Sequence, residues 1–405
     1  MCKGRVSSYL VWGLLVLFAG SSWAAEFDSD KLAVLREKMQ QYVDDHLIAG
    51  AVTVIGSKDG IASLEAFGQQ NIAQSKPMPR DALFRIASMT KPITAMGIMI
   101  LVEEKKLAVD DPVEKYIPEF AGQKLVVSRE GGNVTLGAPP RPITIRDLLT
   151  HTSGLPGGFP APYTDAHFKR QLTLKQTVEI SAQQPLDFAP GSKWSYCNAG
   201  IDTLGRIIEV VSGQSFENFL AKRIFEPLGM KDTTFYPTDE QLTRLAGLYD
   251  QKEGKLQYVE YAIMGPTRGA KHPIPAGGLY STGADIAKLY QLMLQKGSNG
   301  PLHILSANSV AEMTKVQTGT LECGFTPGMS FGYGWAVVRQ PSGVHAMLSA
   351  GTYGHGGVFG TQGWIDPQQD LFVILLIQRV GLPNADNSDI RRDLQTVAVD
   401  ALKKP

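Results

Sequence analysis

The sequence has few cysteines and no excess of charge of either sign. Three cysteines among 405 residues are too few for a disulfide scaffold. The 39 basic residues equal the 39 acidic ones, so no strong basic field is present to hold nucleic acid or an anionic membrane surface. A composition that is 43% hydrophobic and 19% charged excludes coiled coils, collagen-like fibres and wholly disordered chains. The length predicts two to three compact units, or one large domain with a second lobe.

An apolar run at residues 9–20 has about twelve residues, fewer than the ~20 that a transmembrane helix needs. It follows Lys3 and Arg5 and precedes Ser-Trp-Ala at residues 22–24, which places small residues at positions −3 and −1 of a cut before residue 25. This pattern is typical of a secretory signal peptide over residues 1–24. The mature chain is therefore predicted to be periplasmic or secreted, without a stable membrane anchor. An uncleaved anchor is the alternative.

The cysteines of the predicted mature chain are Cys197 and Cys323. Cys2 precedes the apolar run and no cysteine follows it closely, which argues against a lipoprotein. An oxidising compartment would permit one disulfide, but the sequence does not decide whether the two thiols lie close together.

The two ends of the mature chain predict helices that bracket an antiparallel sheet. Residues 28–45 have apolar side chains near helical spacing, and Ser388 is a good N-cap for a last helix to about Lys403. Strands are predicted at 51–57 and 61–68, joined by a turn at 58–60, and at 331–338, 357–366 and 371–378. The last of these is apolar on both faces, so it should be a central strand. The fold class is therefore α/β (α+β), and the sheet is assembled from both termini.

The middle of the chain predicts a second, mostly helical lobe. Residues 88–235 show helical patterns broken by Pro/Gly loops. The α/β lobe would then comprise residues 25–87 and 236–405, with the helical lobe inserted between them.

A candidate nucleophile, Ser88, lies where a long helical run begins. Pro92 lacks an N–H and is tolerated only in the first turn of a helix, so the helix should begin at about Ser88. The backbone N–H of Ser88 is then free to face a ligand, and the helix dipole favours negative charge there. Lys91 lies three residues on, on the same face, and can act as a base if burial lowers its pKa. The alternative for this pair is a serine N-cap with a surface lysine.

A second serine, Ser330, lies in a Gly-x-Ser-x-Gly sequence but lacks the context of a nucleophile elbow. That motif needs a strand before it and a helix after it, followed by an acid and a histidine. A strand-like segment follows Ser330 instead, and no acidic residue lies between it and the last histidine, His355. Ser330 is therefore interpreted as a turn serine at a strand edge.

Two further clusters complete an ordered pattern. A Pro/Gly loop at 190–200 presents Tyr196 and Asn198, and the Gly-rich segment 353–359 opens a strand against which a substrate could lie. In isolation these residues would be read as turn, packing and strand-edge residues. The motifs are FRIASMTK (84–91), LLTHTSGL (148–155), PGSKWSYCNAG (190–200), EPLGMKDTTF (226–235), PAGGLYSTGADIAKL (275–289) and GHGGVFG (354–360). This order resembles the serine β-lactamase/penicillin-recognising superfamily over nearly all of the mature chain, with class C β-lactamases and family VIII carboxylesterases the nearest groups.

The resemblance implies a β-lactamase/transpeptidase-like fold and a role for each matching residue. Ser88 would be the acylated nucleophile, Lys91 its proton partner, and Tyr196 the general base, its phenol pushed toward phenolate by Lys91. Asn198 would hydrogen-bond the acyl side of the substrate. The backbone N–H groups of Ser88 and Val358 would form the oxyanion hole. His151 and Thr152 lie in a signature that is read as structural, and nothing calls for a metal or an organic cofactor.

The third motif departs from the class C pattern. His355, Gly356 and Gly357 occupy the place where class C β-lactamases have Lys and Thr that grip a substrate carboxylate. The loss of each of those contacts removes roughly 1.5–3 kcal/mol of binding free energy for a substrate carboxylate. This favours small-molecule esters without a carboxylate. A protonated His355 would restore some grip at mildly acidic pH. Exchanging His355→Lys with Gly356→Thr is expected to be tolerated and to restore carboxylate selectivity.

The alternatives to an esterase are a D,D-carboxypeptidase or class C-like β-lactamase, an amide hydrolase of the nylon-oligomer type, and a non-catalytic penicillin-binding sensor. A sensor is expected to have lost one of the residues Ser88, Lys91 and Tyr196, and all three are present. The sequence does not decide the physiological substrate, the acyl chain length or the oligomeric state.

Overall fold

The computed structural model describes Met1 and residues 26–260, 268–383 and 385–403. The predicted signal peptide lies outside the described residues, apart from Met1. Within these ranges, every helix is too short or too polar to cross a lipid bilayer.

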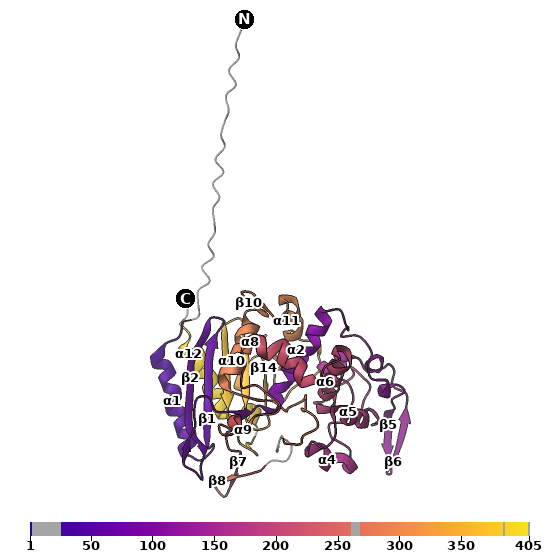
Figure 1. Cartoon of the computed structure of the whole chain (residues 1–405), viewed down its shortest axis with the longest axis horizontal. Helices are drawn as coiled ribbons and strands as arrows, with labels where there is room; N and C mark the ends of the chain where they lie inside the picture. Colours follow the sequence, from indigo (N-terminus) through magenta and orange to yellow (C-terminus); the bar gives the residue numbers. More distant parts are fainter. Residues whose placement is uncertain (2–25, 261–267, 384, 404–405) are drawn as a thin grey trace.

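An eight-stranded antiparallel sheet forms the core of one lobe and joins the two ends of the chain (Figure 1). Its strands, in spatial order, are β12 (Met329–Phe331), β13 (Ala336–Val338), β14 (Tyr353–Gly356), β15 (Gln362–Asp366), β16 (Leu371–Leu376), β1 (Gly50–Ser57), β2 (Gly60–Asn71) and β3 (Lys76–Pro77). The predicted hairpin is β1–β2, and β1 also pairs with β16 from Val52 opposite Leu376 to Gly56 opposite Phe372. This confirms that the sheet is assembled from both termini.

Strand β16 is buried on both faces, as its continuous apolar sequence predicts. Phe372, Ile374 and Leu376 contribute to a core shared with the helical part of the chain. The alternate residues contribute to a second core under the terminal helices. The period of two along a strand explains this division, because successive side chains point to opposite faces.

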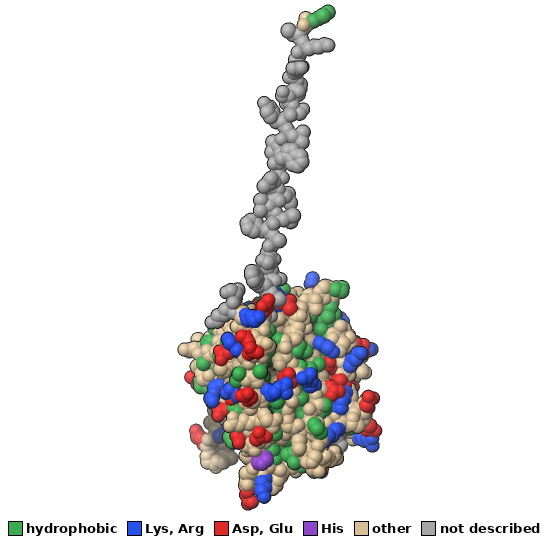
Figure 2. Space-filling view, turned by 90° about the vertical axis from the view of Figure 1, so that its left-hand side faces the viewer, with side chains coloured by type: hydrophobic (Ala, Val, Ile, Leu, Met, Phe, Trp, Pro, Cys, Tyr) green, Lys and Arg blue, Asp and Glu red, His purple; other side chains and the backbone are tan. Residues whose placement is uncertain are grey.

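The terminal helices α1 (Ser29–Asp44) and α12 (Asp389–Ala401) pack together on one face of the sheet, and α10 (Gly283–Leu294) covers the other. Ser388 caps α12 as expected, because its hydroxyl accepts a hydrogen bond from the Arg391 N–H. Figure 2 shows basic and acidic side chains interspersed over the face that carries α1. The ion pair between Arg36 and Glu65, 2.6 Å long, joins α1 to β2 there.

The segment predicted to form the helical lobe lies beside the sheet in Figure 1. Its helices are α2 (Thr90–Glu103), α3 (Ile145–Leu149), α4 (Thr164–Phe168), α5 (Leu174–Ala182), α6 (Asn198–Ser212), α7 (Phe216–Leu220) and α8 (Glu226–Leu228), with a π-helical turn η5 (Ala221–Phe225) before α8. It also contains a hairpin that the sequence analysis did not predict, β5 (Leu125–Glu130) with β6 (Asn133–Gly137). Gly131 and Gly132 make its turn with φ of 54° and 82°, a conformation that glycine adopts without strain.

Short elements complete the fold. The 3₁₀ turns are η1 (Ala87–Met89), η2 (Val113–Lys115), η3 (Pro118–Phe120), η4 (Ala161–Tyr163), η7 (Gly343–His345) and η8 (Ala385–Asn387). The remaining helices are α9 (Asp239–Leu242) and α11 (Ala307–Thr314). The remaining two-stranded pairs are β4 (Phe84–Arg85) with β9 (Tyr280–Ser281), β7 (Tyr249–Lys252) with β8 (Lys255–Tyr258), and β10 (Ser298–Asn299) with β11 (Leu302–His303).

Two of the predicted strands are longer than the strands that form in the structure. The segment 331–338 contains the turn of the β12–β13 hairpin at residues 332–335, in which the Gly332 N–H donates to the Trp335 carbonyl and Gly334 has a φ of 74°. The segment 357–366 begins with a tight turn, because the Gly357 N–H bonds the Thr361 carbonyl at 2.7 Å and Gly360 has a φ of 83°. Strand β15 therefore starts only at Gln362.

Candidate active site

Ser88 lies in the 3₁₀ turn η1, directly before the regular helix α2. The turn is entered through Ala87, which has a left-handed φ of 49° and whose carbonyl accepts a 2.7 Å hydrogen bond from the Thr90 hydroxyl. Pro92 falls in the first turn of α2, as its missing N–H requires. The strained residue and the proline together fix Ser88 at the N-terminal end of the helix, where N–H groups lack intrahelical partners.

Lys91 is fully buried and its amine lies next to the serine hydroxyl. Its Nζ is 3.0 Å from Ser88 Oγ and donates a 2.6 Å hydrogen bond to the Ala276 carbonyl. Burial lowers the pKa of Lys91 to about 7, while the negative charge of Asp202 acts in the opposite direction. A large fraction of this amine is therefore neutral near neutral pH and can accept the Ser88 proton.

Asp202 and Ala276 support Lys91. The sequence pattern includes Ala276 only as part of the motif at 275–289, and it does not include Asp202. Asp202 Oδ1 accepts a 2.9 Å hydrogen bond from the Ala276 N–H, and burial raises the pKa of Asp202 to about 6. This bond holds the segment whose carbonyl faces Lys91. A signal was available for Asp202, because it lies one helical turn after Asn198 on α6 and so shares its face.

Tyr196 lies just before α6, with its ring close to both Lys91 and His151. Lys91 Nζ is 4.6 Å from the ring centroid, and the His151 ring centroid is also 4.6 Å away. Burial raises the pKa of Tyr196 well above its ordinary value, although its hydrogen bond with Ser88 lowers it. Burial therefore opposes the shift toward phenolate that the resemblance implies and favours the protonated hydroxyl.

His151 holds the Tyr196 loop in place. Its Nδ1 accepts a 3.2 Å hydrogen bond from the Cys197 N–H, and its carbonyl accepts one of 2.9 Å from the Ser195 N–H. His151 adopts a φ of 59°, so its backbone turns sharply at this point. Its neighbour Thr152 binds Asp147 through its hydroxyl at 3.3 Å. His151 and Thr152, the first two residues of the HTSGL motif, thus make structural contacts.

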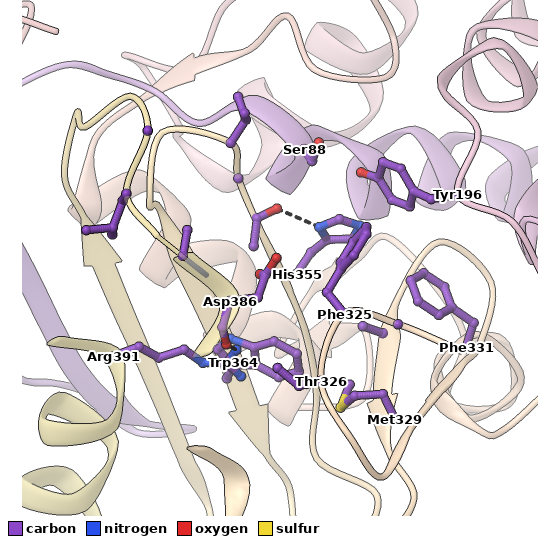
Figure 3. A pocket seen from close by; sticks show the side chains of 18 residues that line it. Ser88, Tyr196, Phe325, Thr326, Met329, Phe331, His355, Trp364, Asp386 and Arg391 are labelled. Carbon is purple, nitrogen blue, oxygen red and sulfur yellow. Dashed lines mark hydrogen bonds between the residues drawn. The ribbon is translucent and has the colours of Figure 1, made fainter. Parts of the chain in front are cut away.

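His355 is buried on β14 and faces Tyr196, with 6.0 Å between the ring centroids (Figure 3). Its Nδ1 is 2.7 Å from the Gly356 carbonyl. Burial, together with the nearby charge of Lys91, lowers the pKa of His355 to about 3. The imidazole is therefore neutral from pH 5 to 8 and offers no positive charge to a carboxylate there.

Gly357 and Val358 follow β14 in the turn described above. A Cβ on Gly357 would lie 2.7 Å from the Ile86 carbonyl, so the absent side chain lets this turn approach the segment that leads to Ser88. Val358 lies in the turn rather than in a strand, and its side chain is 59% exposed. Among the described residues, none accepts a hydrogen bond from the Val358 N–H. This N–H remains a candidate donor to an oxyanion.

Two pockets meet at Ser88, Tyr196 and Val358. The sheet-side pocket has a volume of about 400 Å³ and is lined by Phe325, Met329, Phe331, His355, Gly356, Gly357, Trp364, Asp386 and Arg391 among others. The helix-side pocket has about 260 Å³ and is lined by Ala87, His167, Phe168, Asn198, Asp202, Ile274, Ala276 and Gly277. Asn198, the first residue of α6, is thus separated from the His355–Gly357 motif by the catalytic residues.

Ser330 lines neither pocket, although its neighbours Met329 and Phe331 line the sheet-side pocket. Ser330 is fully buried in the edge strand β12, its Oγ lies 2.8 Å from Thr318 Oγ1, and a turn follows it rather than a helix. Cys197 and Cys323 are both buried free thiols. This structure therefore holds no disulfide between them.

Comparison with known proteins agrees with this geometry. A sequence model of the Beta-lactamase family matches residues 35–398. The chain belongs to this family. Esterase EstB from Burkholderia gladioli is 29% identical over 87% of this chain and 92% of its own length. A putative D-alanyl-D-alanine carboxypeptidase from Escherichia coli K12 is 29% identical over 92% of this chain and 87% of its own length.

Among solved structures, EstCE1, described as a hydrolase with promiscuous acyltransferase activity, has a TM-score of 0.76 at 28% identity. The alignment covers 92% of this chain and 98% of EstCE1. The family and its esterase and carboxypeptidase members indicate a hydrolase of the serine β-lactamase fold.

Proposed function

We propose that this protein is an exported serine esterase that hydrolyses small carboxylic esters through an acyl-enzyme on Ser88. The observation that carries the proposal is the buried Lys91 amine, 3.0 Å from Ser88 Oγ and with a pKa of about 7, at the junction of two pockets. Export is proposed from the signal-peptide pattern of residues 1–24.

In the acylation step, neutral Lys91 accepts the proton of Ser88 as Oγ bonds to the ester carbonyl carbon. The N–H groups of Ser88 and Val358 would bind the developing oxyanion. The bond to the alcohol oxygen then breaks while the Tyr196 hydroxyl donates its proton to that oxygen, and the Lys91 ammonium returns a proton to Tyr196. In deacylation, water bonds to the acyl carbon and gives its proton to Tyr196 while Tyr196 passes its own proton to Lys91. Lys91 then returns a proton to Ser88 Oγ as the bond between Oγ and the acyl carbon breaks, which releases the acid and restores Ser88.

The sheet-side pocket supports an ester rather than a β-lactam or a D-Ala-D-Ala peptide. Its third motif carries a neutral imidazole and glycines where a carboxylate grip would need a cation and a hydroxyl. Esterase EstB and EstCE1, each under 30% identical to this chain, are consistent with this reading.

The second candidate is a D,D-carboxypeptidase or class C-like β-lactamase. It is favoured by the putative carboxypeptidase, which is 29% identical over 92% of this chain, and by the retained Ser88, Lys91 and Tyr196. Both functions use the same acyl-enzyme, so only the substrate separates them.

The experiment compares p-nitrophenyl esters of increasing acyl length, nitrocefin and a D-Ala-D-Ala peptide, using residues 25–405 produced by export. We expect the highest kcat/KM for short neutral esters, from pH 5.5 to 8. A preference for nitrocefin or for the peptide by orders of magnitude would replace the esterase with the second candidate.

A further inference from the structure

The sheet-side pocket contains a carboxylate that neither the mechanism nor the family motifs use. Asp386, in the 3₁₀ turn η8 after β16, lies half-buried in the wall of this pocket near His355 (Figure 3). A Cβ placed on Gly356 would be only 2.2 Å from Asp386 Oδ1. The carboxylate therefore lies directly against Gly356, in the motif where the related lactamases are expected to grip a substrate carboxylate.

A chain of hydrogen bonds fixes the side chain of Asp386. The indole N–H of Trp364 donates to Gln362 Oε1 at 3.0 Å, and Gln362 Nε2 donates to Asp386 Oδ1, also at 3.0 Å. Trp364 and Gln362 are buried on strand β15. Because each donor is itself oriented by the strand, the acceptor oxygen of Asp386 is held at this position.

One cation, Arg391, lines the same pocket, and the charge of Asp386 raises its pKa against the effect of burial. Within the described ranges, however, the carboxylate of Asp386 forms no salt bridge, because Arg391 donates to the backbone carbonyl of Asp386 at 2.5 Å. The other Arg391 nitrogens contact Gln395 and His345 at 3.0 Å, and the guanidinium stacks on Trp364 at 4.1 Å from its centroid. Arg391 is buried and committed to protein partners, whereas the charge of Asp386 reaches the site, where it raises the pKa of Tyr196.

We propose that Asp386 is a specificity-determining residue that excludes a carboxylate from the sheet-side pocket and favours an ester substituent that carries a positive charge. The proposal deepens the esterase function proposed above and rests on it. Without the contacts of the lactamase motif, a substrate carboxylate gains no binding energy in this pocket. A fixed carboxylate on the protein goes further, because it repels the substrate carboxylate. The aromatic wall of Phe325, Phe331 and Trp364 suits a quaternary ammonium group as well as an apolar one.

The test uses acetate esters of similar length and three charges, namely acetylcholine, its neutral isostere 3,3-dimethylbutyl acetate, and the anion 4-acetoxybutanoate. A second series places the same charges in the acyl group of p-nitrophenyl esters, because the responding series identifies which half of the ester occupies this pocket. We expect the wild type to prefer the cation over its neutral isostere by roughly five- to tenfold in kcat/KM, and the neutral ester over the anion by a similar factor. Raising the ionic strength to about 1 M should compress both ratios.

The variant Asp386→Asn keeps an acceptor for Gln362 and should bring both ratios close to one. The matched control is Asp389→Asn, which removes the same charge from an exposed residue that pairs with Arg392 at 2.6 Å, outside either pocket. This control should keep the wild-type ratios. Ratios that Asp386→Asn leaves unchanged in both series would overturn the proposal.

A binding measurement separates this outcome from a failure of the esterase function. Phenylboronic acids with a meta trimethylammonium or a meta carboxylate group form an adduct on a reactive serine without ester turnover. Calorimetry of the wild type and Asp386→Asn should show a cation preference that the substitution removes. If the neutral ester is not hydrolysed but this preference is present, the esterase function fails and the role of Asp386 stands; equal affinities in the wild type contradict that role.

Discussion

The two pockets that share Ser88 are built from different parts of the fold. The sheet-side pocket takes its wall from strands β12 to β15 and the turn η8, so its residues are aligned by a hydrogen-bonded ladder. The helix-side pocket is formed by α4, the start of α6 and the segment 274–277. Its acid, Asp202, is buried and acts on Lys91, whereas Asp386 faces the space of the sheet-side pocket. One carboxylate therefore tunes the catalyst and the other is placed to select the substrate.

The largest effect is expected from Ser88, because it lines both pockets. Ser88→Ala should abolish the hydrolysis of every ester, whichever pocket its substituent occupies, since the nucleophile is lost. Ser330→Ala should retain most of the activity. Mass spectrometry after a fluorophosphonate probe measures this directly, and an adduct on the Ser330 peptide instead of the Ser88 peptide would overturn the assignment.

Tyr196 also belongs to both pockets, and its loss should be smaller. Tyr196→Phe is expected to lower kcat by about 10²–10⁴-fold with little change in KM, because proton donation to the leaving group acts in the transition state. The effect should be weaker for p-nitrophenyl esters, whose leaving group needs little protonation, than for alkyl esters. An equal loss for both kinds of ester would show that the tyrosine acts by packing.

A change confined to the sheet-side pocket should alter stability before it alters selectivity. His355→Lys with Gly356→Thr, expected from the sequence to be tolerated, would bring a Cβ to 2.2 Å from Asp386 Oδ1 and 2.5 Å from Gln362 Nε2. We expect a lower Tm, by several degrees for roughly 1–3 kcal/mol of overpacking. Adding Asp386→Ala should recover much of that Tm and raise kcat/KM for nitrocefin above that of the double variant. Thermal unfolding of the wild type, the double variant and the triple variant measures these differences in Tm. A double variant as stable as the wild type would contradict the clash.

The smallest effect is a shift in pH dependence from the helix-side pocket. In the wild type, kcat/KM should rise with pH through about 7, because neutral Lys91 is the base. The charge of Asp202 raises the pKa of Lys91, so Asp202→Asn should lower that pKa and move the acidic limb of the profile to lower pH. The asparagine oxygen can still accept the Ala276 N–H. A limb that stays in place would mean that Asp202 acts only through its hydrogen bond.

The same comparison shows what could be predicted from the sequence. Rules based on neighbouring residues sufficed for features that depend only on neighbouring residues. The missing N–H of Pro92 fixes the helix start, and the apolar run of β16 shows that both faces are covered. The same rules failed at residues 357–361, where β-propensity favoured a strand but glycines at 357 and 360 close a turn.

The roles of Asp202 and Asp386 depend on tertiary contacts and could not be read locally. Asp202 meets Ala276, and Asp386 meets Gly356 and Gln362, residues distant in sequence that only the folded chain brings together. The direction of the Tyr196 pKa was missed for a related reason. The sequence shows that a lysine is near, but not that the phenol is buried, which raises its pKa.

The pairing of β1 with β16 has a consequence for how the chain folds. Val52 lies opposite Leu376, so the centre of the sheet joins residues from the N-terminal and the C-terminal parts of the chain. The entropy lost on closing so long a loop must be overcome before the strand pairing stabilises the chain, and this is typical of slow folding. During synthesis, β1 and β2 can form their hairpin early, but its other edge stays open until almost the entire chain has been made. Until then the apolar face of that hairpin is uncovered, so we expect the unfinished chain to be prone to aggregation.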